Sequence, residues 1–166
     1  MFKSLGFQRS NLKVVQLLVV APLIAVMMFI LWWYALIPGV TYLTGQPMDF
    51  SLFEPYKGNL EAILTLFPYV WVSAAFGEEI LFRGYLMRQF TKFFGDSRVS
   101  LVINIVLFGV IFGWLHAYQG ISGQIVTGIV GSLFAIIFHV RKHDLWFNVA
   151  LHGFLDTIAL VLIYIG

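Results

Sequence analysis

Cysteine is absent from this chain of 166 residues, and charged residues make up only 11% of it. Without cysteine the chain forms no disulfide, no thiolate metal site and no cysteine nucleophile, so any chemistry has to come from Glu, Asp, His or Ser. The basic residues that give the net charge of +2 are few and scattered between hydrophobic segments. They form no dense basic face, which excludes a nucleic-acid binder.

Hydrophobic residues make up 60% of the chain, too many for an ordinary soluble domain. They form runs without Lys, Arg, Asp or Glu at residues 14–48, 62–77 and 99–140. About 20 apolar residues in a helix cross the hydrocarbon core of a bilayer. A β-barrel would instead alternate lipid-facing and lumen-facing residues, and these runs are continuous. The sequence therefore predicts an all-α, polytopic integral membrane protein that has the lipid bilayer as a partner.

Turn-forming residues divide these runs into about five transmembrane helices. As a single helix the third run would be about 63 Å long, twice the thickness of the bilayer core, so it must fold back near residues 118–123. Pro38-Gly39 is expected to end the first helix, and Asp96 or Ser97 to cap the third. The predicted helices, packed in one bundle, are residues 14–37, 59–94, 98–117, 123–140 and 145–165.

Positive charge alternates between the connections of the predicted bundle. The first hydrophobic run is too long for a signal-peptide core and lacks a small-residue cleavage site, so it is expected to stay uncleaved. Only Lys57 falls on one side of the membrane. By the positive-inside rule the other side, with the N terminus, is cytoplasmic. The residues on that side are Lys3, Arg9, Lys13, Arg88, Lys92, Arg98, Arg141 and Lys142.

The second helix contains ionisable side chains, which are costly inside a membrane and are therefore candidates for a functional site. Glu79 and Arg83 are four residues apart with the acid first, which favours an intrahelical ion pair. Glu78 points about 100° away from Glu79 around the helix and has no local partner. A buried carboxylate near a cation is a tunable general base. The alternative is that both glutamates are interfacial groups surrounded by lipid headgroups.

The third and fifth helices contribute histidines and one further carboxylate. His152 and Asp156 are about 40° apart around the helix axis, so both can face one cavity. Asp156 either holds a helix contact through a hydrogen bond or orients the imidazole toward a metal or an oxyanion. His116 is either a helix-to-helix hydrogen-bond donor or a member of the site. A pocket where these three helices converge would suit the hydrolysis of an amide, and the face on which it opens stays undecided.

Three short motifs in this order resemble the CPBP family of intramembrane proteases. The patterns EExxxR, FxxxH and HxxxD are found at residues 78–83, 112–116 and 152–156. The family comprises the CAAX prenyl endopeptidases and the bacterial Abi proteins of bacteriocin processing and self-immunity. The resemblance covers residues 60–166 as a protease core, and leaves residues 1–59 as an N-terminal segment with a variable transmembrane helix and a loop.

The resemblance implies a role for each motif residue. Glu78 would activate the attacking water with help from His116. His152 and Asp156 would stabilise the tetrahedral oxyanion or position the substrate carbonyl. Glu79, Arg83 and Phe112 would support the site.

The chain departs from the prenyl-protease branch at one position. That branch has Asn where this chain has Asp156, and an ionised Asp cannot donate a hydrogen bond to an oxyanion. Asp156 is therefore expected to orient His152, bind a metal or stay protonated. Asp at this position, with the small size, favours the bacterial branch and a bacterial plasma membrane.

The sequence requires no cofactor, although zinc is possible. Glu78, His116 and His152 could supply a carboxylate and two imidazoles to Zn²⁺, with water as the fourth ligand. The sequence has no HExxH motif, and a water held between Glu78 and His116 can act without metal. We favour activation of water by glutamate and histidine.

Two functions remain in competition. The first is an intramembrane endopeptidase, or metalloprotease-like hydrolase, that cleaves a membrane-associated or prenyl-type peptide or protein. The second is a non-proteolytic scaffold or bacteriocin self-immunity protein of the same fold. All the motif positions are filled, which favours proteolysis. A small transporter is less consistent with the sequence, because the chain is short and has no inverted repeat.

Overall fold

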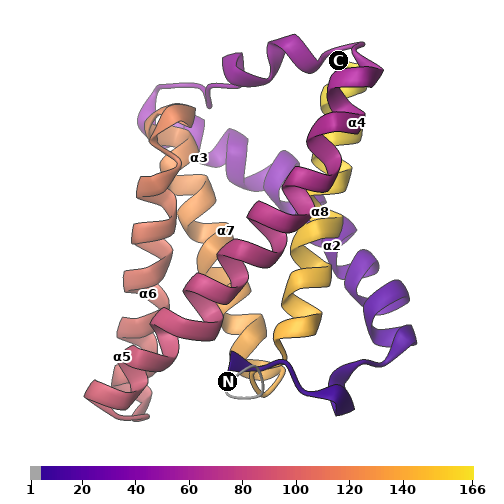
Figure 1. Cartoon of the computed structure of the whole chain (residues 1–166). Coiled ribbons are helices and arrows are strands. Elements are labelled where there is room, and N and C mark those ends of the chain that lie inside the picture. Colours follow the sequence, from indigo (N-terminus) through magenta and orange to yellow (C-terminus); the bar gives the residue numbers. More distant parts are fainter. Residues whose placement is uncertain (1–4) are drawn as a thin grey trace.

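The computed structural model describes residues 5–166, whose regular structure is entirely helical (Figure 1). Five helices are long and apolar enough to cross a membrane, and they pack together in one bundle. This confirms the predicted all-α membrane protein with about five transmembrane helices. Their spans are Gln16–Thr44, Leu60–Phe94, Arg98–Leu115, Ala117–Val140 and Leu145–Ile165.

In the first two spans, α-helix alternates with π-helical segments, in which each hydrogen bond runs to the fifth residue along the chain. The first span contains η2 (Gln16–Val20), α2 (Ala21–Leu31), η3 (Trp32–Leu36) and α3 (Ile37–Thr44). The second contains α4 (Leu60–Tyr69), η5 (Val70–Glu78), η6 (Ile80–Leu86) and α5 (Met87–Phe94). The remaining helices are η1 (Arg9–Asn11), η4 (Ser51–Tyr56), α6 (Arg98–Leu115), η7 (Ala117–Gln119), α7 (Gly120–Val140) and α8 (Leu145–Ile165).

The predicted fold-back of the third hydrophobic run is confirmed as the α6–η7–α7 hairpin. Ser97 caps α6 by accepting a hydrogen bond from the main chain three residues on. Gly109 and Gly113 face Gly128 and Ser132 on α7, and a Cβ at either α6 glycine would collide with α7 atoms. The two helices therefore approach as closely as small residues allow.

The first helix does not end at Pro38-Gly39, and this prediction was wrong. The helix continues to Thr44 and stops at Gly45, which has a left-handed φ of 68°. Pro38 lies in the first turn of α3, directly after the π-helical segment η3. Proline is tolerated there because a changed hydrogen-bond pattern accommodates its missing N–H.

The first span packs against α8 inside the bundle. Ala21 and Ala25 of α2 are fully buried in a cluster that also holds Phe147 and Leu151 of α8. Small side chains on α2 let the two helices lie close together. The division into residues 1–59 and 60–166 stays a prediction.

The second span is strongly inclined and crosses the bundle diagonally, from the end near the C terminus to the end near the N terminus (Figure 1). On the way it packs against α8 through η5 and against α6 through α5. If the helices were straight and parallel, Glu78, His116 and His152 would lie at different depths in the membrane. The inclination of the second span removes this difference. The middle of the inclined helix reaches α7 and α8 together.

Candidate active site

The Glu79 carboxylate is the centre of a buried polar cluster. It is fully buried and accepts hydrogen bonds on Oε1 from Arg83 Nη1 and His152 Nδ1, each at 3.0 Å. Asn148 Nδ2 donates to the other oxygen at 3.2 Å. Glu79 therefore has donors from its own helix and from α8, which is the arrangement that a buried charge needs.

Arg83 extends this cluster to α7. Its Nη2 donates to the Gly131 carbonyl at 2.6 Å, and the guanidinium carbon lies 5.1 Å from the Phe112 ring and 5.4 Å from the Phe134 ring. These distances are typical of cation–π contacts. The predicted Glu79–Arg83 ion pair is present, and Arg83 also joins the second span to α6 and α7.

The His152 imidazole lies between two carboxylates. Its Nδ1 faces Glu79, and its Nε2 lies 3.5 Å from Asp156 Oδ2. A proton on either ring nitrogen thus has a carboxylate next to it. The Asp156 side chain keeps 28% of its surface exposed, whereas that of His152 keeps 7%. Asp156 therefore forms the more open edge of the cluster.

His116 ends the third span, as the residue directly after α6. Its Nδ1 lies 2.8 Å from the Phe112 carbonyl, and its ring packs against Phe112 and Tyr118. A carbonyl only accepts, so Nδ1 donates this hydrogen bond and a neutral ring keeps Nε2 as an acceptor. Electrostatic interactions of His116 run to His152 and Asp156. The structure brings it to the open side of the cluster without a hydrogen bond to Glu78.

Glu78 differs from its neighbour. It is only partly buried, and within residues 5–166 its carboxylate has no hydrogen bond or ion pair. Electrostatic interactions connect it with His152, Glu79 and Arg83. The predicted site residues thus gather around His152, and Glu78 is the carboxylate of this cluster that has neither a hydrogen bond nor an ion pair within residues 5–166.

Asn148 belongs to the cluster, although the sequence analysis did not predict it. Its side chain is fully buried, and Nδ2 donates to Phe134 O at 3.0 Å as well as to Glu79. The signal in the sequence was its spacing, because Asn148, His152 and Asp156 follow one another at four-residue intervals on one face of α8. A buried amide one turn before a motif histidine is a candidate partner for the same site.

The residues proposed for zinc do not form a metal site in this arrangement. Across residues 5–166, no three His, Asp or Glu side chains are grouped so that they could hold an ion. Both His152 nitrogens already face carboxylates, and His116 Nδ1 faces a carbonyl. His152 would have to give up one of these carboxylates to bind zinc.

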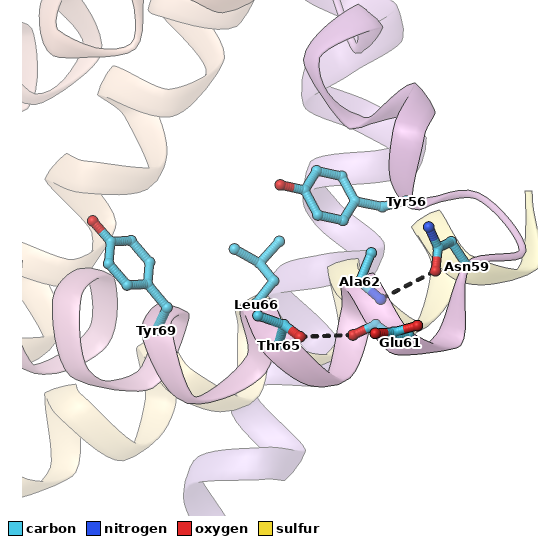
Figure 2. A pocket seen from close by; sticks show the side chains of 7 residues that line it. All are labelled: Tyr56, Asn59, Glu61, Ala62, Thr65, Leu66 and Tyr69. Carbon is cyan, nitrogen blue, oxygen red and sulfur yellow. Dashed lines mark hydrogen bonds between the residues drawn. The ribbon is translucent and has the colours of Figure 1, made fainter.

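A shallow groove of about 480 Å³ lies elsewhere, between the loop that precedes α4 and one face of α4 (Figure 2). Tyr56 and Tyr69 flank it, and Asn59 caps the helix there by accepting a hydrogen bond from the Ala62 N–H at 3.1 Å. Its one carboxylate, Glu61, is exposed. The groove contains no histidine and none of the predicted site residues, so it is not a candidate for hydrolysis.

The fold and this cluster define an integral membrane protein with carboxylates and imidazoles converging inside the bundle. The family model described as type II CAAX prenyl endopeptidase Rce1-like matches residues 60–158, which is more than half of the chain. The chain therefore belongs to this family, which supports a CAAX-type intramembrane endopeptidase activity in general. Searches of curated proteins and of solved structures gave no match.

Proposed function

We propose that this protein hydrolyses a peptide bond in a prenylated or otherwise membrane-associated peptide, with Glu78 as the general base. The observation that carries this proposal is the difference between the two adjacent glutamates. Glu79 is saturated by three side-chain donors, whereas Glu78 has none within residues 5–166. A base needs a free lone pair within reach of water, and Glu78 has one.

In the proposed reaction Glu78 takes a proton from a water molecule, and the resulting hydroxide attacks the carbonyl carbon of the substrate. His116 assists by accepting a hydrogen bond from the water on Nε2. The tetrahedral intermediate then collapses as the C–N bond breaks, and the proton held by Glu78 passes to the leaving amine. Atoms and charge balance without a further reactant.

The oxyanion of the intermediate needs a hydrogen-bond donor, and His152 is the proposed one. The ring is fixed by Glu79 on Nδ1, so Nε2 is directed toward the open side of the cluster. Asp156, 3.5 Å from Nε2, orients the ring and balances its charge when both nitrogens carry protons. This role suits an aspartate, which cannot itself donate when ionised.

Glu79, Arg83 and Asn148 form the supporting frame in this proposal. They connect the second span to α7 through the carbonyls of Gly131 and Phe134. A site is accurate when its groups are held by neighbours that cannot move. We therefore assign these residues to positioning rather than to bond breaking.

We also propose that the N terminus is cytoplasmic and that the protein lies in a bacterial plasma membrane. The segment before η2, the α5–α6 connection and the α7–α8 turn share one end of the bundle (Figure 1). Within residues 5–166, the basic residues that the positive-inside rule uses lie in these segments or in the helix turns next to them: Arg9, Lys13, Arg88, Lys92, Arg98, Arg141 and Lys142. Reporter tags at residues 1 and 166 should fall on opposite sides of the membrane.

The deciding experiment uses the purified protein in lipid nanodiscs and quenched fluorescent peptides, one prenylated and one not. Wild type should cleave the prenylated peptide, and Glu78→Gln should not. Glu61→Gln is the matched control, because it makes the same change at an exposed glutamate far from the cluster. Cleavage of neither peptide by the wild type would instead favour the scaffold or immunity function, and equal cleavage by wild type and Glu78→Gln would show that Glu78 is not the base.

A further inference from the structure

The N-terminal segment lies in a slot between the second span and α8. We define this slot by the residues that line it: Phe76 and Ile80 of the second span, Leu145, Trp146 and Val149 of α8, and Phe138 of α7. Phe7 is its occupant and keeps only 7% of its surface exposed. Residues 5–7 accordingly lie at the end of the bundle where α7 turns into α8 (Figure 1).

Aromatic contacts hold Phe7 in the slot. Its ring stacks on Phe76 with a centroid distance of 5.4 Å and meets Trp146 edge-on at 4.6 Å. Both distances fall in the range of favourable aromatic pairs. The slot therefore has an aromatic pocket that accepts a large apolar side chain.

Gly6 makes the main-chain contact next to this pocket. Its carbonyl accepts a hydrogen bond from the Leu145 N–H at 3.3 Å, and its φ is 111°. A Cβ at Gly6 would lie 2.5 Å from the His143 carbonyl oxygen, so this position takes only glycine without displacement. Leu5 then passes over Gly84, where an added Cβ would lie 3.6 Å from Leu5 Cβ.

The slot adjoins the candidate active site. Ile80 follows Glu79 directly, Phe76 comes two residues before Glu78, and Val149 is almost one helical turn before His152. A peptide in the slot would therefore lie between the same two helices that hold the carboxylates and the imidazole. The slot occupies the end of this gap that faces the N-terminal side of the bundle.

Displacement of residues 5–7 is feasible in a membrane setting. Among the described residues, the contacts of this segment with α8 include one main-chain hydrogen bond, together with apolar and aromatic packing. Phenylalanine and leucine that leave the slot can enter the bilayer interface, where an apolar segment next to Arg9 and Lys13 is stable. The segment and a substrate can thus exchange without exposing the aromatic ring to water.

We propose that this slot binds an apolar peptide segment in which a small residue separates two large apolar side chains, and that residues 5–7 occupy it as an internal competitor of the substrate. This inference rests on the proposed function for the identity of the competing peptide. It assigns to the N-terminal segment a regulatory role, because a substrate that needs the slot must first displace it.

A disulfide tether tests the competition directly. The chain has no cysteine of its own, so Leu5→Cys with Gly84→Cys forms a single defined bridge, and the 3.6 Å Cβ separation suits a disulfide. We expect at least about tenfold loss of peptide cleavage on oxidation and full recovery on reduction, since only the open state binds substrate. The two single-cysteine variants are the controls. Unchanged cleavage by the oxidised protein would overturn the proposal.

A substitution that weakens the binding of residues 5–7 should open the slot. Gly6→Ala introduces the Cβ that meets His143, and the expected result is a KM about tenfold lower with kcat unchanged. Gly39→Ala is the matched control, because its added Cβ meets nothing within 4 Å. If Gly6→Ala lowers the yield of folded protein, Phe7→Ala empties the aromatic pocket instead. An unchanged KM in folded variants of both kinds would contradict the proposal.

A binding measurement separates this inference from the proposed function. A fluorescent peptide with the sequence of residues 5–13 is titrated against wild type and Gly6→Ala in nanodiscs, and anisotropy is recorded. Binding to Gly6→Ala but only weakly to wild type supports the slot even if no substrate is ever cleaved. Absence of binding to both proteins, with cleavage intact, would overturn the slot and leave the protease.

Discussion

Glu79 and Glu78 are adjacent in the sequence but lie in opposite environments. Glu79 is fully buried, and three side chains from two helices donate to it. Glu78 is only partly buried and receives no hydrogen bond from residues 5–166. The comparison shows how one short motif can supply both a structural carboxylate, fixed by its partners, and a chemical one, left free to take a proton.

The largest effect should follow from removing the free carboxylate. Glu78→Gln keeps the shape and polarity of the side chain, so folding and substrate binding should survive. Turnover should fall by about 10²- to 10⁴-fold, as expected for a lost general base. Cleavage rates and melting temperatures measured together check this prediction. A wild-type rate in Glu78→Gln would show that Glu78 is not the general base.

The structural role of Glu79 is tested by removing Arg83, its cationic partner. Arg83→Ala leaves Glu79 buried beside one imidazole and one amide, and it also removes the side-chain donor of the Gly131 carbonyl. Loss of one partner from a buried ion pair costs about 3–5 kcal/mol, so thermal stability in detergent should drop together with activity. Unchanged stability with activity lost would instead place Arg83 in contact with substrate.

The helices and the motif pairs could be predicted from the sequence, because each depends on local spacing. Uncharged runs and turn residues define the spans, and four-residue intervals define the pairs Glu79–Arg83 and His152–Asp156. The continuation of the first helix beyond Pro38 could not be predicted, because it depends on the π-helical segment η3, which has no sequence signature. The same holds for the inclination of the second span, which packs against α8 through η5 and against α6 through α5.

Asn148 marks the limit for the site. Its sequence spacing places it on the face of His152, but only the tertiary structure shows that its amide reaches both Glu79 and the Phe134 carbonyl. The slot occupied by Phe7 depends likewise on three segments far apart in the sequence. Contacts of this kind follow from how helices pack, which hydrophobic patterns do not specify.

A smaller effect is expected when Asn148, the neutral amide that donates to Glu79, is replaced. Asn148→Ala removes two hydrogen bonds from buried acceptors, at a cost of about 1–3 kcal/mol. Cleavage should fall less than in Glu78→Gln, because Glu79 keeps Arg83 and His152. Asn148→Asp should be more harmful than Asn148→Ala, since it places a second carboxylate next to Glu79. The order of melting temperatures among the three proteins checks this, and a more stable Asp variant would contradict it.

The smallest effect concerns metal removal. Both His152 nitrogens face carboxylates, and within residues 5–166 no three His, Asp or Glu side chains are grouped so that they could hold an ion. Prolonged dialysis against a strong chelator should therefore change the cleavage rate by less than about twofold, because the proposed base is Glu78 and needs no ion. The rate before and after chelation, with zinc content measured on the same sample, decides the matter. Loss of cleavage on chelation, restored by stoichiometric Zn²⁺, would mean that Glu78, His116 and His152 rearrange around a metal, and Glu78 would then be a ligand as well as a base.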